Sequence, residues 1–483
     1  MVKRKSKKVS VPVNDCSTWK LNSDVLLYLM LNFLDDEEFW AVMHSCQVLY
    51  TAGISGYISQ KGTIEIYKPD HLFSFWRFMS GRGRTGYLAL RGFRFLGNLW
   101  YGEETNYLWS ILKRSINLKE LELYTDTLAR REEYAVFVGA LEHLEILTLH
   151  GPYNYRCAVT LKLLGSPVVK VNLSFGFYDP IPLLANFQQS LEEIDGSCIN
   201  FQEPNHSQPF IYPKVTSFSI VNCKKPLTSA LVTAFPNLKW LSIDNEEDVY
   251  DGDPNRDSRL ARERSALCKT NEKFQQTQSW DVLDFLSIDL PRLYMLALTC
   301  KVHYLLLTGP FFYDEEDIYW FKSSLALIRP TRLGLNLQTL RFPLECMDEI
   351  LSIGTQELKR LDIHLEIESP HPDPEGVSVP EEALDDLFNV LRILNLETLD
   401  VKMEWEPATL YHCDRISAAA AYIEQIDIRT LAEKALEAAP TLRFIVFKLL
   451  CPEEREGYFC INPATNTLEE LSEWEGEVRR NAA

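Results

Sequence analysis

Residues 118–123 read LKELEL, and two similar stretches follow, LEILTL at 144–149 and VVKVNL at 168–173. Each stretch has apolar residues at its first, fourth and sixth positions, and the three begin 26 and then 24 residues apart. The fourth and sixth positions alternate as in a β-strand with one buried face. A phrase that returns at this period predicts a solenoid of stacked units, because one unit cannot bury its own apolar face.

Further copies of the phrase continue along the chain. They begin at Leu191, Val215, Leu238, Leu293, Leu337, Leu358, Leu396 and Leu442. The copies before residue 245 keep spacings of 23 to 26 residues, whereas the later ones are uneven, which indicates insertions or degenerate units. Helical spacing of apolar residues appears between copies, over 227–234 and 381–394. The chain therefore reads as strand, then helix, repeated.

This order of elements resembles the leucine-rich-repeat family over roughly residues 88–450. The family signature also places Asn or Cys three positions after the last Leu of the phrase, and among these copies Cys223 fits that position. The resemblance implies an α/β fold, in which an irregular solenoid has a parallel sheet on one side and helices on the other.

Charge and composition restrict the partners. The net charge of −19 opposes a phosphate backbone as the main partner, so no nucleic-acid partner is expected. Eleven cysteines without a C-x-x-C pair favour a reducing compartment, and no stretch has the length of a membrane span. The basic cluster of residues 3–8 is either a nuclear address or a solvated tail. We expect a cytoplasmic or nuclear protein, or one found in both compartments, without a membrane partner.

Residues 21–52, LNSDVLLYLMLNFLDDEEFWAVMHSCQVLYTA, do not follow the repeat. The stretch 25–34 is apolar at every position except Asn32. A helix that packs against one core needs an apolar stripe, whereas this one is apolar almost all round and should be buried on more than one side. An acidic helix start at 35–38 follows. The sequence predicts two or three short helices with surplus apolar surface.

This segment resembles an F-box, with Asn22 where that family has proline. The resemblance implies docking onto the Skp1 adaptor, and through it a cullin, of a ubiquitin ligase. The residues expected to bind Skp1 are Leu21, Val25, Leu26, Leu29, Phe33, Leu34, Phe39, Cys46 and Leu49. The alternative is that these helices only cover the open end of the solenoid.

The expected organisation has five parts. They are a basic disordered tail (1–12), an F-box-like helical module (13–56), a linker with the first, N-capping repeat (57–117), the solenoid (118–450) and an acidic C-terminal cap or tail (451–483). Within the solenoid, 245–280 is rich in charged and amide residues and 368–382 carries four prolines, so we expect mobile or extended insertions there. Either insertion is a candidate client-binding loop or an idle surface loop.

Catalytic, metal and cofactor motifs have little support. The string GRGRTG at 81–86 matches G-x-G-x-x-G, but a dinucleotide site needs a strand before it and a helix after it, and we expect a strand over 87–90. The nearest possible metal ligands, His412 with Cys413 and Cys451 with Cys460, match no common zinc spacing. We expect no catalytic residue, no bound metal and no cofactor.

The sequence is compatible with two functions. The first is a non-enzymatic substrate receptor of an SCF-type (Skp1–cullin–F-box) ubiquitin ligase, which binds Skp1 through its N-terminal helices and an unknown client protein through the repeats. The second is a leucine-rich-repeat scaffold or inhibitor with no ligase link. Exposed apolar surface on the helix over 25–34 would favour the first.

Overall fold

The computed structural model describes most of the chain beyond the N-terminal module. The described residues are 57–58, 61–80, 85–97, 104–126, 132–151, 155–203, 209–223, 225–244, 254–308, 315–338, 351, 353–368, 378–406, 422, 424–450, 454–462, 465 and 467–482. They form two compact units, the first made of residues up to 150 together with 163–166, and the second of 151–162 and 167–483. The basic tail and the F-box-like module lie outside the described residues.

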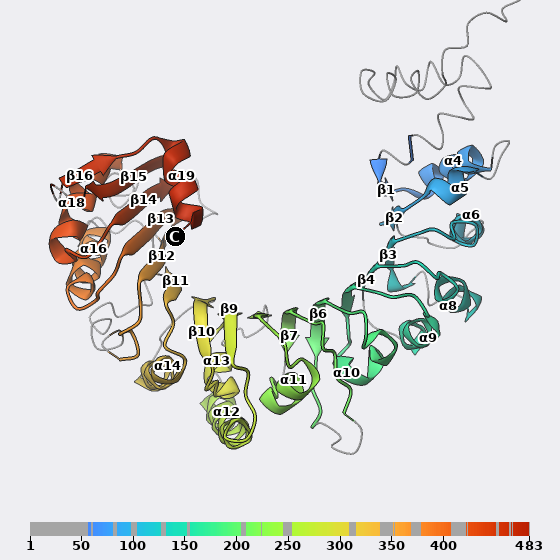
Figure 1. Cartoon of the computed structure of the whole chain (residues 1–483), viewed down its shortest axis with the longest axis horizontal. Helices are drawn as coiled ribbons and strands as arrows, with labels where there is room; N and C mark the ends of the chain where they lie inside the picture. Colours follow the sequence, from blue (N-terminus) through green and yellow to red (C-terminus); the bar gives the residue numbers. More distant parts are fainter. Residues whose placement is uncertain are drawn as a thin grey trace, which may run out of the picture. The chain divides into compact units, whose positions relative to one another are not determined.

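In the first unit, four parallel strands follow one another in sequence order, with helices between them (Figure 1). The elements are β1 (Thr63–Ile66), α4 (Pro69–Met79), α5 (Thr85–Ala89), β2 (Gly92–Phe95), α6 (Glu104–Leu112), β3 (Glu120–Tyr124), α8 (Glu132–Gly139) and β4 (Ile146–His150). Leu121 and Leu147 pair across β3 and β4, as the phrase predicts, and both are fully buried.

The second unit continues the same pattern (Figure 1). Its elements are α9 (Tyr155–Leu163), β5 (Lys170–Ser174), α10 (Pro180–Leu183), η1 (Ala185–Phe187), β6 (Glu193–Ile199), β7 (Ser217–Cys223), α11 (Thr228–Ala234), β8 (Trp240–Asp244), α12 (Pro254–Gln275), β9 (Val282–Ile288), α13 (Leu290–Leu296), β10 (Lys301–Leu307), α14 (Glu315–Ile328), β11 (Arg332–Gln338), β12 (Arg360–Glu368), α16 (Ser378–Leu391), β13 (Thr398–Glu406), α18 (Ile428–Ala438), β14 (Phe444–Leu450), β15 (Glu454–Asn462), β16 (Thr467–Glu470) and α19 (Glu473–Ala482). Strands β5 to β14 are parallel and paired in sequence order, and β15 and β16 then reverse direction.

The core of the second unit lies between the sheet and the helices on one side of it (Figure 1). The apolar residues of the phrases fill this core: Val171, Phe218, Leu241, Leu361 and Ile445 are each at most 1% exposed. We call the opposite side of the sheet the inner face. The mixed α/β fold with mostly parallel, sequentially ordered strands is thus the one that the repeated phrase predicts.

Two predicted strands are wrong. The phrase at Leu293 lies in α13, where Asp289 caps the helix by accepting a hydrogen bond from the Arg292 amide, and Pro291 stands in the first turn. The phrase at Leu337 is out of register, because β11 ends at Gln338 and buries Leu333 and Leu335 before it. Strands β9 and β10 were not recognised in the sequence.

The stretch 245–280 is not extended throughout, since residues 254–275 form the long helix α12. It lies outside the sheet, as its composition requires. Among the described side chains of α12, the buried ones are the amides Asn271 and Gln275 and not aliphatic side chains. Asn271, fully buried, donates to the carbonyls of Pro226 and Met295 and accepts from the Thr228 amide. Gln275 donates to the carbonyls of Leu296 and Ala297. These bonds satisfy backbone groups that would otherwise be buried without partners.

Three smaller expectations change as well. Residues 87–89 belong to helix α5 and not to a strand, and the strand begins at Gly92. Helix α16 begins at Ser378, inside the proline-rich stretch 368–382. At the C-terminus, β15, β16 and α19 form ordered structure over the acidic segment. Among the described helices, none combines the length and the hydropathy needed to cross a membrane.

Candidate functional site

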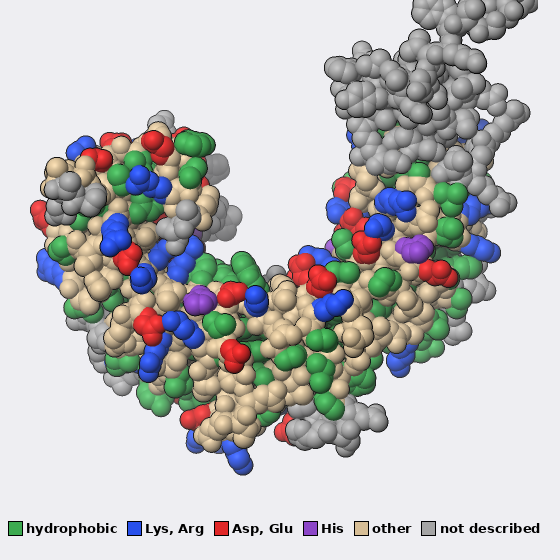
Figure 2. All heavy atoms as spheres, viewed as in Figure 1, with side chains coloured by type: hydrophobic (Ala, Val, Ile, Leu, Met, Phe, Trp, Pro, Cys, Tyr) green, Lys and Arg blue, Asp and Glu red, His purple; other side chains and the backbone are tan. Residues whose placement is uncertain are grey.

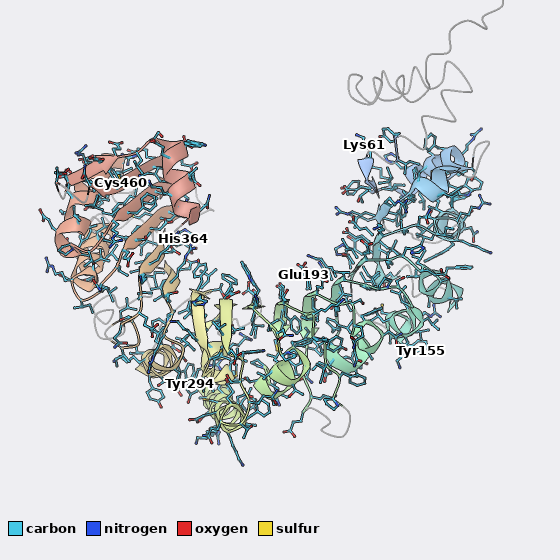
Figure 3. The ribbon with its side chains drawn as sticks, viewed as in Figure 1. Lys61, Tyr155, Glu193, Tyr294, His364 and Cys460 are labelled. Atoms are coloured by element: carbon cyan, nitrogen blue, oxygen red, sulfur yellow. The ribbon has the colours of Figure 1, made fainter. Side chains whose placement is uncertain are left out.

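The inner face of the second unit carries side chains that the core does not use. In β12, Leu361 and Ile363 are buried toward the helices, so Arg360, Asp362 and His364 point to the inner face. Because the strands pair in register, inner-face residues form rows across the sheet. In Figure 3, Glu193 and His364 lie on this strand side, whereas Tyr294 lies among the helices.

A pocket of about 470 Å³ opens on the inner face, between β10 to β13 and the end of α19. Four basic and two acidic side chains line it, with Tyr304 and Gly334 among the uncharged residues. The charged lining residues are Arg332, Arg360, Asp362, Asp400, Lys402 and Arg480. Figure 2 shows basic and acidic side chains gathered over this part of the unit. The whole chain has a net charge of −19, so the excess of basic side chains is a feature of the pocket and not of the chain.

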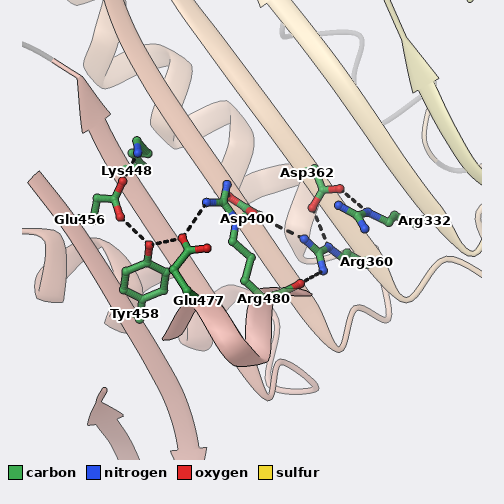
Figure 4. A network of polar contacts seen from close by, with 9 residues as sticks. All are labelled: Arg332, Arg360, Asp362, Asp400, Lys448, Glu456, Tyr458, Glu477 and Arg480. Carbon is green, nitrogen blue, oxygen red and sulfur yellow. Dashed lines mark hydrogen bonds and ion pairs between the residues drawn. The ribbon is translucent and has the colours of Figure 1, made fainter. Parts of the chain in front are cut away.

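Five of these residues form a polar network (Figure 4). Arg332 Nε lies 2.5 Å from Asp362 Oδ2, and Arg360 Nε lies 2.7 Å from the other oxygen of the same carboxylate. Arg480 Nε and Nη2 lie 2.7 and 3.3 Å from the two oxygens of Asp400, which is also 3.5 Å from Arg360 Nη2. The network therefore joins β11, β12, β13 and α19 through charge-assisted hydrogen bonds.

The network is buried at its centre. The side chains of Arg360 and Asp400 are 5% and 6% exposed. Burial raises the pKa of Asp400, and the nearby Arg480 charge offsets that effect only in part. Burial also raises the pKa of the Tyr304 hydroxyl, with the Asp362 charge acting in the same direction. A buried charge cluster of this kind contributes little net stability, which favours a role in recognition.

Helix α19 lies on the inner face and closes one side of the pocket (Figure 1). Beneath it, Phe444, Val446 and Tyr458 form a buried apolar cluster with Leu471. Gly476 makes the close approach possible, because a Cβ atom there would stand 2.2 Å from Cγ of Tyr458. The Tyr458 hydroxyl lies within hydrogen-bond distance of two carboxylates, those of Glu456 and of Glu477 (2.7 Å), and its one hydrogen can be donated to either.

A second row of charges lies beside the network. Lys402 Nζ is 2.9 Å from Glu404 Oε2, and His364 Nε2 is 3.0 Å from the same oxygen. The hydrogen bond from Lys402 lowers the pKa of Glu404 against the opposing effect of burial. These partly exposed pairs extend the polar surface along β12 and β13.

The first unit has its own charged cluster, centred on Arg94 of β2, on the side of the sheet opposite to the buried Phe93 and Phe95. Its guanidinium contacts Glu65 and Glu120 at 2.8 and 2.7 Å, and Glu122 at 3.1 Å. His150 Nε2 lies 2.6 Å from Glu122. Three carboxylates around one guanidinium give this cluster the opposite charge balance to the pocket in the second unit.

None of the residues expected to bind Skp1, from Leu21 to Leu49, lies within the described residues, nor do His412, Cys413 and Cys451. Cys460 is buried in β15 opposite Phe444. In the part of the chain that the structure describes, no group of three or more metal-ligating side chains occurs. Helix α4 precedes the G-x-G-x-x-G string and helix α5 begins within it, at Thr85, so a helix stands where a dinucleotide site needs a strand.

Sequence reasoning missed the pocket residues, although a signal for one of them was present. In each phrase the residue just before the second Leu faces away from the core, and Arg360 is the pocket residue that stands at that position. Tyr304 and Arg332 were missed because the strand of Tyr304 was not recognised and the strand of Arg332 was predicted in the wrong register.

No protein-family model matches the chain, and no curated protein sequence matches it significantly.

Proposed function

We propose that this chain is the substrate-recognition subunit of an SCF-type ubiquitin ligase, with no catalytic activity of its own. The N-terminal helices would bind a Skp1-like adaptor, and through it a cullin. The inner face of the repeats would hold a client protein. Ubiquitin transfer would then be accelerated by proximity, because the receptor raises the effective concentration of a client lysine near the ligase.

One combination supports this proposal. An F-box-like segment precedes an array of parallel strands whose inner face carries a lined pocket and many side chains that the core does not use. A protein that only stacks repeats has no need of a buried charge network on that face, because such a network adds little stability.

The test is capture of the adaptor by the full chain. Leu29 and Phe33 stand one helical turn apart in the sequence, and burying each is worth roughly 1.5 to 3 kcal/mol. Leu29→Asp combined with Phe33→Asp should abolish co-purification with a Skp1-like protein. The matched control is Tyr155→Asp with Tyr319→Asp, since these tyrosines are 68% and 61% exposed and lie on the helices of the second unit.

Circular dichroism of both double variants should remain that of the wild type. The proposal fails if the wild-type chain captures no Skp1-like protein, or if the folded Leu29/Phe33 variant captures it as well as the control does. The alternative function is a leucine-rich-repeat scaffold or inhibitor with no ligase link. Client capture without adaptor capture would favour that alternative.

A further inference from the structure

An aromatic row crosses the inner face next to the pocket. Register pairing places Trp240 of β8, Phe285 of β9 and Tyr304 of β10 side by side. Their ring centroids are 4.8 and 5.1 Å apart, and the Arg332 guanidinium lies 4.1 Å from the Tyr304 ring centroid. Trp240 is 53% exposed although it is a large apolar side chain. An exposed aromatic surface of this kind marks an interaction site more often than an isolated exposed residue does.

The pocket adjoins one end of the aromatic row, because Tyr304 and Arg332 are among its lining residues. The next residues along the same strands are Ser242, Ser287, Leu306 and Gly334, which also pair in register. A Cβ atom on Gly334 would stand 2.8 Å from Leu306 Cδ1 and 3.1 Å from the Tyr304 hydroxyl, so glycine keeps the pocket open at this point. Strands β8 to β11 span three inter-strand spacings, about 14 Å, which matches about four residues of extended peptide.

Arg332, at the end of the aromatic row, has terminal guanidinium nitrogens that the described residues do not use. Its Nε is bound to Asp362, while no described residue forms a hydrogen bond with Nη1 or Nη2. The other basic side chains of the pocket are engaged, because Arg360 binds Asp362 and Asp400, Arg480 binds Asp400, and Lys402 binds Glu404. A guanidinium with a free pair of terminal nitrogens is shaped to bind a carboxylate through two parallel hydrogen bonds.

At the level of the aromatic row, α19 covers the residue that follows Arg332 across the sheet, which is Arg360 of β12. Arg360 Nη1 donates to the backbone carbonyl of Arg480 at 2.8 Å, so the end of α19 lies over β12. Arg480 and Asn481 both line the pocket. A peptide that crosses from β8 toward β11 would meet the end of α19 there and could not continue across the sheet. A chain end fits here better than the middle of a polypeptide.

We infer that the inner face from β8 to β11 binds the extended C-terminal residues of a client protein. The terminal carboxylate lies on the free nitrogens of Arg332, and apolar side chains of the preceding residues lie against Trp240 and Phe285. This inference rests on the proposed function for the identity of the peptide as a client, while the binding itself requires no adaptor.

The probe is a pool of fluorescein-labelled hexapeptides whose last four positions are randomised. The pool is made with free C-terminal carboxylates and, separately, with C-terminal amides. Peptides retained by the full-length chain are sequenced, and the best are titrated singly by fluorescence anisotropy. We expect retention from the carboxylate pool, enriched in apolar residues before the last position. Amidation should weaken the affinity about tenfold to a hundredfold, which is the usual effect of losing charge-assisted hydrogen bonds.

Two variants, each with a matched control, test which residues bind the peptide. Arg332→Gln should remove the preference for the carboxylate, and the fold should survive because Asp362 keeps Arg360 as its partner. Arg329→Gln is the matched control, since Arg329 is exposed just beyond α14. Trp240→Ser should weaken both peptide forms about tenfold or more, whereas Tyr319→Ser, on the outer helix α14, should weaken neither.

Three outcomes overturn the inference. Equal binding of the carboxylate and amide forms would remove the role of the terminal carboxylate. Arg332-dependent binding of an amidated peptide with an internal glutamate would show that the site reads an acidic side chain. Retention of no peptide from either pool would exclude a peptide site.

These measurements contain no Skp1, so the two proposals fail independently. Peptide binding without adaptor capture would leave the site intact and remove the ligase assignment. Adaptor capture without any carboxylate dependence would do the reverse.

Discussion

Replacing Arg480 by Met should loosen the docking of α19 on the inner face. The guanidinium contacts both oxygens of Asp400, at 2.7 and 3.3 Å, and the Asp400 side chain is 6% exposed. Hydrogen bonds between charged groups contribute about 1.5 to 3 kcal/mol, and we take about 2 kcal/mol because Arg480 is 27% exposed and Asp400 keeps Arg360 nearby. Methionine preserves the length and apolar part of the side chain.

Hydrogen exchange of the peptide covering 473–482 measures this effect, because a helix that undocks locally exchanges without global unfolding. A loss of about 2 kcal/mol corresponds to roughly 30-fold faster exchange. Arg479→Met, at the neighbouring exposed position, should change the rate less than about threefold. Equal exchange in the two variants, or no acceleration in Arg480→Met, would refute the assignment of α19 docking to the Asp400 contact.

Three further predictions concern packing and pH. Gly476→Ala should accelerate exchange in α19, because the new Cβ would meet the Tyr458 ring, whereas Gly165→Ala, which has open space, should leave stability within about 0.5 kcal/mol. Asn271→Ala should lower the unfolding free energy by about 2 to 3 kcal/mol in chemical denaturation, since two carbonyls and one amide lose their buried partner; a loss below about 0.5 kcal/mol would contradict this. The folded pKa of Asp400 is raised above its ordinary value of 3.8, so its contribution to stability is fully present below that value and is lost as the pH rises through the raised pKa. Asp400→Asn should therefore gain stability relative to wild type as the pH rises from 4 toward 7, and a constant difference in thermal midpoint across that range would count against it.

The sequence predicted a strand correctly where the second and third apolar residues of the phrase are both buried. At Leu358 and Leu442, the residues three and five positions further on enter the core, and β12 and β14 begin two residues after each phrase starts. The spacing of 23 to 26 residues added the decisive information, because it holds over several units. Period and alternation together were sufficient for the parallel order of these strands.

The phrase failed at Leu293 because a spacing of three residues belongs to helices as well as to this repeat. Leu290, Leu293 and Leu296 recur every third residue, and Asp289 with Pro291 gives a helix start that the phrase did not take into account. In β11 the alternation of Leu333, Leu335 and Leu337 was the better guide.

Helix α12 could not be anticipated from composition. A segment poor in aliphatics was expected to be mobile or extended, yet its long run of helix-forming residues forms a helix that buried amides hold in place. Such anchoring depends on which carbonyls the neighbouring elements leave unpaired. That information exists only in the folded arrangement.

The aromatic row with Arg332 was equally hidden, because its residues are distant in sequence. Trp240, Phe285, Tyr304 and Arg332 come from four strands, and only the register between those strands places them in one row. Neither spacing nor residue type distinguishes them from other exposed positions until the register is known.

Because side chains alternate along these strands, the residues that fill the core and the residues that face away from it are different residues. Leu241, Leu286, Leu305 and Leu333 are buried in the core of the second unit, while the residue preceding each of them faces the other side of the sheet. Substitutions at those preceding positions leave the core residues unchanged. Under the proposed function, such a chain could therefore acquire new clients through single substitutions, one strand at a time.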